Sequence, residues 1–303
     1  MKKVKWILVV IAMAVISCTK QENEGELTYL RINSVSTVQS DDASKLTKAA
    51  IQGTSFPTGE KVSVGLFVVG EGYTDAKYRN IEYTKPAGSD TFTDPGIALI
   101  QGKTATVYAY YPYDGAISDI TQIPVTSSVG GNDWMWATPI ENVSTENPSI
   151  DLTFHHSLAL VEIIFNVFGP AGRSMTNVTV AGGDGAFSAT GTMDATDSGK
   201  LIPGTAATKS APFSQDVSLQ VSDSKIVADC LLVPGKTGDD ADARQDFYIK
   251  CTYNGKEYGI SLTGSEKGVI VRSKTKSTIL LNIKDDKLEV VATDYDIDTS
   301  KWW

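Results

Sequence analysis

Residues 150–167 read IDLTFHHSLALVEIIFNV, and this stretch decides the fold class. Its first part, DLTFHHSL (151–158), alternates polar and apolar side chains, which is typical of a strand with one buried face. Its second part, VEIIFNVF (161–168), carries apolar residues on both faces of the expected strand, which predicts a central position in a sheet. The two successive strands therefore indicate a β-sheet protein in which the first strand has one buried face and the second lies centrally in a sheet.

Strand-like runs continue on both sides of this stretch, with turn residues between them. Asn254-Gly255, in TYNGKEYG, is a strong hairpin signal because a tight primed turn needs positive φ at both positions. Outside the N-terminal segment the pattern indicates no helix, so a β-sandwich architecture is expected. The sequence predicts an all-β chain of two tandem sandwiches, an N-terminal one over residues 49–152 and a C-terminal one over residues 153–303.

The N-terminus has the form of a secretion signal. Three lysines among the first five residues precede an apolar run over residues 6–16, which is far shorter than the roughly 20 residues of a spanning helix. The small Ser17 before Cys18 resembles the lipobox of bacterial lipoproteins. Residues 1–17 are therefore expected to be cleaved as a signal peptide and Cys18 to carry lipid on the outer membrane, the alternative being an ordinary signal that contains a cysteine.

Residues 18–48 are expected to hold a lipid tether, a first strand and a cleavable loop. The acidic residues Glu22, Glu24 and Glu26 resemble the acid-rich segment of surface-exported lipoproteins of Bacteroidetes, although a short acidic tract also fits a solvated linker. In GELTYLRINSV, Leu30 and Ile32 form the only apolar pair on one face of the candidate strand.

The charge of the chain excludes one class of partner. The formal charge is −9, and loss of the three signal lysines makes it −12. Nucleic acid attracts basic surfaces, so it is not an expected partner.

Two cysteines remain after Cys18, and two states are open to them. Cys230 and Cys251 lie in IVADCLLVPG and DFYIKCTYNG, which read as consecutive strands that would place the cysteines nearly opposite each other in a hairpin. Outside the cytoplasm they could form a disulfide. Adjacent antiparallel strands suit disulfide geometry poorly, so two buried free thiols are the alternative.

The sequence offers no matched set of catalytic groups, so no enzyme activity and no cofactor is expected. The only histidines, His155 and His156, point to opposite faces of a strand, so we expect one packed and one exposed residue rather than a metal site. The loop GDDADARQD lacks the glycine and the final glutamate of an EF-hand, which favours a solvated loop over a calcium site. A sugar-stacking surface, half of it expected to be core, could be built from Tyr108, Tyr110, Tyr111, Tyr113, Trp134 and Trp136.

Four motifs in order resemble the fimbrillin family of Bacteroidetes. They are FPTGEKVSVGLFV (56–68), KTATVYAYYPYDG (103–115), DWMWATPI (133–140) and IDLTFHHSLALVEIIFNV (150–167), whereas the region beyond residue 170 shares only the general strand pattern. The resemblance implies two transthyretin-like β-sandwiches and a lipoprotein subunit of a type V fimbria.

The resemblance also implies an assembly mechanism. A trypsin-like protease cuts after a basic residue, the first strand leaves, and the groove takes an extended segment of another subunit. Lys45 and Lys48 are the basic residues expected in the loop after the first strand. Many pilins use arginine, but the nearby Arg31 lies inside the strand, which puts the identity of the protease in doubt.

The C-terminal tail is the candidate donor of such a segment. KLEVVATDYDIDTSKWW alternates at Leu288 and Val290 against Val291 and ends on Trp302 and Trp303. A donated tail would make the chain a stalk or anchor subunit, whereas a tail packed on its own domain would suit a tip subunit. The expected function is thus a fimbrial subunit with other pilins as partners, and the rival is a monomeric surface lipoprotein that binds glycan.

Overall fold

The computed structural model describes residues 27–37, 56, 59–93, 96–167, 174–183, 185–221, 224–236, 244–284 and 287–294. Almost every regular element in these ranges is a β-strand. The exceptions are the one-turn 3₁₀ segment η1 (Ala76–Tyr78) and the short helix α1 (Gly264–Lys267). The prediction of an all-β fold is confirmed.

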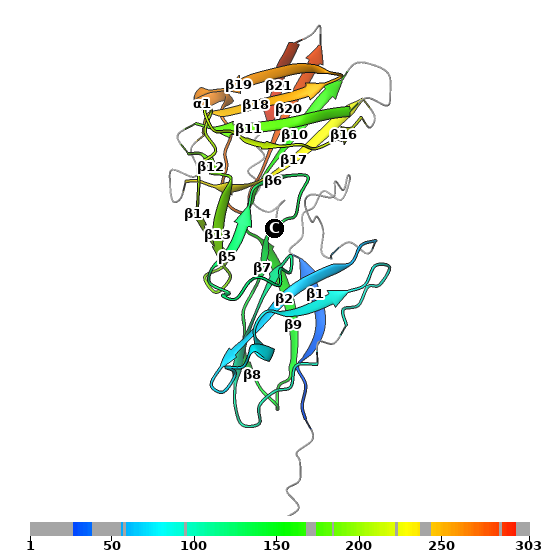
Figure 1. Cartoon of the computed structure of the whole chain (residues 1–303), viewed down its shortest axis with the longest axis vertical. Helices are drawn as coiled ribbons and strands as arrows, with labels where there is room; N and C mark the ends of the chain where they lie inside the picture. The colour runs from blue at the N-terminus through cyan, green and yellow to red at the C-terminus, as the bar shows by residue number, and fades with distance from the viewer. Residues whose placement is uncertain are drawn as a thin grey trace, which may run out of the picture.

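A seven-stranded sheet forms the lower lobe of the elongated molecule (Figure 1). Its order is β1-β9-β7-β4-β2-β3, and β8 also pairs with β4. β1 runs parallel to β9, whereas the other pairs are antiparallel. The strands are β1 (Arg31–Thr37), β2 (Val62–Gly70), β3 (Ile81–Lys85), β4 (Ala105–Tyr111), β7 (Met135–Ala137), β8 (Ile140–Val143) and β9 (Ser149–His156).

Two facing sheets form the upper lobe, which is a β-sandwich (Figure 1). One sheet has the order β12-β17-β10-β20-β21 with β6 beside β17, and the other has the order β15-β11-β18-β19 with β16 beside β11. The strands of the first are β6 (Ser128–Val129), β10 (Ala159–Val167), β12 (Phe187–Ser188), β17 (Lys225–Pro234), β20 (Lys276–Lys284) and β21 (Lys287–Asp294). Those of the second are β11 (Ser174–Gly182), β15 (Phe213–Gln215), β16 (Leu219–Gln220), β18 (Phe247–Tyr253) and β19 (Lys256–Leu262).

The strands β10, β18 and β19 bear out two local predictions. β10 lies between β17 and β20, which is the central position predicted from its apolar sequence. Asn254 and Gly255 join β18 to β19 with φ angles of 51° and 75°, as the turn signal requires.

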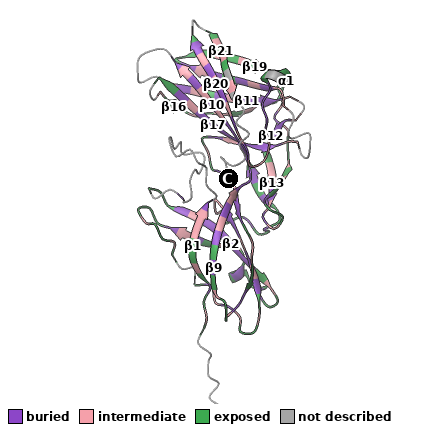
Figure 2. Ribbon diagram, turned by 180° about the vertical axis from the view of Figure 1, so that it is seen from behind, coloured by how far each residue is buried: buried purple, intermediate pink, exposed green. Residues whose placement is uncertain are grey.

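Each lobe has its own apolar core, built from alternate residues of its strands (Figure 2). The lower core takes Val64, Leu66 and Val68 from β2 and Leu152 and Phe154 from β9. The upper core takes the odd-numbered residues of β10. This period of two is why an alternating sequence buries one face of a sheet.

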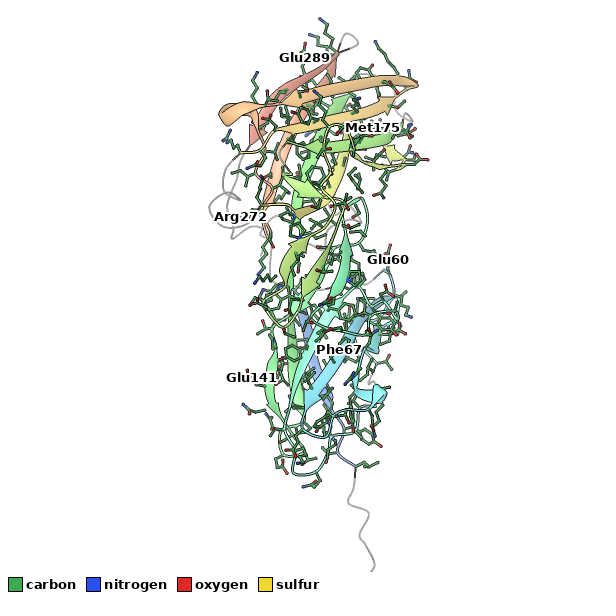
Figure 3. All side chains as sticks on the ribbon, turned by 60° about the vertical axis from the view of Figure 1, so that its left-hand side comes forward. Glu60, Phe67, Glu141, Met175, Arg272 and Glu289 are labelled. Atoms are coloured by element: carbon green, nitrogen blue, oxygen red, sulfur yellow. The ribbon has the colours of Figure 1, made fainter. Side chains whose placement is uncertain are left out.

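A third apolar cluster joins the lobes, and we call it the waist cluster. It lies on a small sheet of order β14-β13-β5, which Figure 1 shows between the lobes. Its strands are β5 (Ile123–Thr126), β13 (Thr190–Asp194) and β14 (Lys200–Pro203). Phe67, labelled in Figure 3, enters the cluster from the lower lobe, and Leu231 enters it from the upper lobe.

The chain changes sheets close to the expected position. β9 ends at His156 in the seven-stranded sheet and β10 begins at Ala159 in the six-stranded sheet. Residues 123–129 cross in the other direction, because β5 pairs with β13 and β6 pairs with β17. The division into two domains near residue 153 stays a prediction.

The expected hairpin around the two cysteines is wrong. β17, which carries Cys230, pairs with β10, whereas β18, which carries Cys251, pairs with β11 and β19. The strands are consecutive in sequence but belong to opposite sheets of the sandwich. Both thiols point into the upper core, are buried, and are free.

Candidate functional site: the slot of the first strand

The first described segment of the chain lies in a slot of the lower lobe. On one side, β1 is paired with β9 from Arg31↔Ser149 to Thr37↔Phe154. On the other side, the Leu30 N–H donates to the Ile97 carbonyl at 2.8 Å, and the Leu99 N–H donates to the Thr28 carbonyl at 2.8 Å. Residues 28–30 therefore have backbone partners at 97–99 and residues 31–37 have partners along β9, and removal of the segment would leave both sets of main-chain groups unpaired.

The side chain of Leu30 anchors this segment. It is 0% exposed and belongs to the lower core, whereas the neighbouring Tyr29 is 41% exposed. Ile32 also packs against the lower core, so the predicted inward face of the strand is confirmed at both apolar positions.

A β-bulge changes the inward face halfway along the strand. The register shifts between Ile32 and Ser34, so Val35 rather than Ser34 packs against the core and Thr37 is buried. This shift was not predicted from the sequence, because the inserted Asn33 interrupts the alternation without ending the strand. As a result, the apolar contacts of the first strand with the core continue from Ile32 to Val35.

Polar contacts complete the interaction on the solvent side. Ser34 Oγ donates to Asp151 Oδ1 at 2.6 Å, and Ser36 Oγ lies 3.5 Å from Thr153 Oγ1. These contacts are exposed or half-buried and are replaceable by water. The burial of Leu30, Ile32 and Val35 therefore contributes more to the hold on the strand.

The body of the lower lobe resumes at Phe56. Its ring is 3% exposed and lies 5.0 Å from the ring of Tyr111 and 5.4 Å from that of Phe154. The predicted cleavage residues Lys45 and Lys48 fall between Thr37 and Phe56 in sequence and lie outside the described residues, as does Cys18. A cut there would leave the first strand held by non-covalent contacts alone.

The candidate donor residues lie in β21. This strand pairs with β20 in an antiparallel hairpin at the edge of the six-stranded sheet. Leu288 and Val290 pack against the upper core, and Val291, at a register shift, is 49% exposed. The predicted tail is thus a strand of its own sheet as far as Asp294, and Trp302 and Trp303 lie outside the described residues.

The aromatic residues proposed for sugar stacking are buried or half-buried. Tyr110 is 0% exposed and Trp136 is 7% exposed, and both belong to the waist cluster. None of the other four is in the exposed class: Tyr108, Tyr111, Tyr113 and Trp134. Tyr108 and Trp134 pack partly buried against the waist cluster and Tyr111 against the lower core, so these six rings do not form an exposed stacking surface.

The two histidines lie on opposite faces of β9, as predicted. His156 is buried, and its Nδ1 lies 2.6 Å from Asp133 Oδ2. His155 is half-buried and stacks on Trp136 with ring centroids 4.7 Å apart, and burial lowers the pKa of its imidazole. In the described part of the chain, no group of three or more His, Cys, Asp or Glu side chains could hold a metal ion.

The acidic loop is described only at its last carboxylate. Asp239, Asp240 and Asp242 lie outside the described residues. Asp246 Oδ1 accepts a hydrogen bond from the Gly264 N–H at 3.0 Å. The solvated-loop interpretation of the other three carboxylates stays a prediction.

A second buried carboxylate lies on the upper lobe, away from the slot. Asp229 of β17 is 2% exposed and stands opposite Glu162 of β10, which forms an ion pair of 3.2 Å with Lys276. Burial and, to a smaller extent, the charge of Glu162 raise the pKa of Asp229 to about 7. Asp229 is therefore a source of pH-dependent stability.

Comparison with known proteins gives a family and a fold. The family model described as fimbrillin-like matches residues 47–302. The crystal structure of a "putative cell adhesion protein" from Bacteroides uniformis is similar with a TM-score of 0.56 and 17% identity, over 89% of this chain and 97% of that chain. A protein described in the same words from Bacteroides ovatus is similar with a TM-score of 0.57 and 15% identity, over 88% and 96%.

At these identities the two structures establish the likeness of fold alone. No curated protein sequence matches the chain. No helix among the described residues is long and apolar enough to cross a membrane.

Proposed function

The chain belongs to the fimbrillin-like family, as its motifs indicated, and from that premise we propose that it is a fimbrial subunit assembled by exchange of its first strand. Fimbrillin-like proteins are structural, which agrees with the expectation of no enzyme activity. The proposal places the protein at the cell surface with other fimbrial subunits as partners.

The position of Leu30 carries the proposal. Its segment is a short N-terminal piece that fills a slot, rather than a strand in the middle of a continuous sheet. Withdrawal of the segment would uncover the edge of β9 and the apolar side chains of Ile150 and Leu152, which are 2% and 0% exposed. An extended segment of another subunit could restore both the hydrogen bonds and the apolar contacts.

Cleavage is proposed after Lys45 or Lys48. Both residues lie between the last contact of the first strand, Thr37, and the first contact of the body, Phe56. A cut at either position converts an intramolecular contact into a bimolecular one, so the high effective concentration of the tethered strand is lost. A cut after either lysine leaves the first strand intact, whereas a cut after Arg31 would divide the strand.

Export as a lipoprotein is proposed from the N-terminal sequence. Cys18 would carry lipid on the outer membrane, and the tract that ends at Glu26 would serve as the tether. Cleavage in the loop would then leave the folded body joined to its membrane anchor only through the non-covalent contacts of the first strand, and departure of that strand would both open the slot and release the body.

The pairing of β21 favours a subunit that accepts a strand without donating its own. β21 could serve as a donor only after it left β20, where Leu288 and Val290 pack against the core. A tip position fits this arrangement better than the stalk position that the alternating tail sequence suggested.

The experiment replaces residues 43–48 by the recognition site of a sequence-specific protease. After cutting, the opened slot should take up an added peptide of residues 27–37, while the uncut protein should take up none. In a matched control, Ser34→Cys and Asp151→Cys, which stand opposite each other in the register, would hold the first strand in place. Uptake should then occur only under reducing conditions, and a cut protein that takes up no peptide in either condition would overturn the proposal.

A second lock separates the tip from the stalk. Asn282→Cys with Glu289→Cys joins β20 to β21 at paired positions. A tip subunit should still accept a partner's strand with this lock closed, whereas a stalk subunit that donates β21 should lose self-assembly.

A further inference from the structure

The outer face of the five-stranded sheet holds a groove that the strand-exchange proposal does not use. It consists of two adjoining hollows of about 420 and 340 Å³, each within the size range of small-ligand sites. The two hollows share Thr179, Lys250 and Gly259, so they form one continuous groove across β11, β18 and β19.

The groove exists because of local departures from regular strand structure. Gly259 stands opposite Lys250 in the β18–β19 pair and contributes no side chain to the outer face. On β11 the register shifts between Thr176 and Thr179, where Asn177 has a φ of 50°. A bulge of this kind bends the strand and redirects its side chains, which deepens the face beside the missing side chain.

Two lysines give the groove a positive charge. Lys209 stands on the turn before β15, with Nζ 4.7 Å from the ring centroid of Tyr248 on the groove floor. Lys250 rises from β18 into both hollows. Among the described residues that line the groove, the carboxylate is that of Glu257 in the smaller hollow, and both lysines line the larger hollow. On a chain with a formal charge of −9, a pair of lysines around a hollow favours an anionic ligand.

The other lining groups favour a saccharide over a peptide. Hydroxyl groups come from Thr179, Ser214 and Ser261, and apolar surface comes from Pro212 and Ala181. A saccharide presents both hydroxyl groups and apolar C–H faces. A peptide strand would need unpaired backbone at the groove floor, but the floor strands already pair with each other as β11–β18–β19.

We propose that this groove binds an acidic saccharide, with its anionic group between Lys209 and Lys250 and its sugar ring over Gly259. The anionic group can be a carboxylate or a sulfate, since a lysine ammonium serves both as a point charge. The site lies on the upper lobe and the strand slot lies on the lower lobe, so binding should occur in the uncut protein.

The test is calorimetric titration of the uncut protein with 3′-sialyllactose, a chondroitin sulfate disaccharide and neutral lactose. The expected result is binding of a charged probe, roughly tenfold or more tighter than lactose, because a charge-assisted hydrogen bond contributes that much. Tighter binding of sialyllactose would identify a carboxylated ligand, and tighter binding of the disaccharide would identify a sulfated one. Equal binding of all three probes, or binding of none, would overturn the proposal.

Variants locate the binding in the groove. Lys209→Ala with Lys250→Ala should weaken binding of the charged probe roughly tenfold or more, whereas Lys225→Ala, outside the groove, should leave that affinity unchanged. Gly259→Leu should also block binding. A Cβ there would lie 3.4 Å from Lys250 Cγ, an ordinary contact, and Gly259 is exposed, so the leucine side chain can extend into the hollow; thermal unfolding of the variant checks that the fold is kept.

Gly59→Leu is the matched control for the glycine variant, since a Cβ there meets nothing within 4 Å. Full binding by Gly259→Leu, or by the double lysine variant, would show that the saccharide binds elsewhere. Failure of this site would leave the strand-exchange proposal untouched, because the two are tested on different forms of the protein.

Discussion

The substitution Leu30→Ala tests how strongly the first strand is held. Leu30 is 0% exposed in the lower core, and loss of a fully buried leucine side chain costs about 2–5 kcal/mol. In the uncut protein the free energy of unfolding should fall by that amount. In the protein cut between Thr37 and Phe56, the same energy should appear in the release of the strand, which should become faster by a factor of about 30 or more.

Two assays measure these effects. Urea unfolding of the uncut variant gives the stability change, and native mass spectrometry of the cut variant gives the rate at which the N-terminal fragment leaves. The control is Arg31→Ala, because Arg31 is exposed and its backbone N–H still donates to the Pro148 carbonyl. It should change stability by less than about 0.5 kcal/mol. Equal release rates for the Leu30 and Arg31 variants would refute the claim that Leu30 anchors the strand.

Three further predictions concern the rest of the molecule. The pKa of Asp229 is about 7 in the folded protein against an ordinary value of 3.8, so between these values the folded state binds a proton that the unfolded state does not. The free energy of unfolding should therefore fall as pH rises from about 4 to 7, by at most about 4 kcal/mol. Asp229→Asn should remove this slope in urea unfolding across that range, and an unchanged slope would assign it to other groups. Gly199→Ala should destabilise the protein by about 2 kcal/mol more than Gly88→Ala. Both glycines have positive φ, but an added Cβ would overlap the indole ring of Trp136 at Gly199 and would meet nothing within 4 Å at Gly88. Equal thermal shifts for the two variants would contradict this close contact. Cys230 and Cys251 should resist a thiol reagent at neutral pH until the protein unfolds, because burial raises the pKa of both thiols, that of Cys251 to about 12; a disulfide in the purified protein would contradict the free thiols.

Local pattern predicted the strands well, because side-chain alternation follows directly from strand geometry. The apolar run of β10 predicted a central strand, and Asn254-Gly255 predicted a hairpin turn. The alternation around Leu30 also predicted the inward-facing side chains of the first strand as far as Ile32. In each case the signal lies within a few consecutive residues.

Pairing between distant strands was not predictable in the same way. The strands of Cys230 and Cys251 look like a hairpin in sequence, but they lie in opposite sheets, since alternation identifies a buried face and not a partner. Residues 123–129 likewise gave no sign that they cross to strands of the upper lobe. Non-local contacts of this kind depend on the packing of the whole sandwich.

The slot itself was only half predicted. The strand that fills it was predicted from alternation, but the second wall at Ile97 and Leu99 comes from a short apolar stretch with no strand pattern of its own. The bulge at Asn33 was also missed, because one inserted residue changes the inward face without changing composition.

Replacement of the first strand by an added peptide tests most directly whether the slot holds an exchangeable strand. The protein cut between Thr37 and Phe56 would be incubated with an isotope-labelled peptide of residues 27–37 and weighed by native mass spectrometry. We predict that the labelled peptide replaces the resident fragment one for one, and that a peptide carrying Leu30→Asp does not. A cut protein that keeps its original fragment indefinitely, or that loses the fragment and takes up neither peptide, would contradict a slot built for an exchangeable strand.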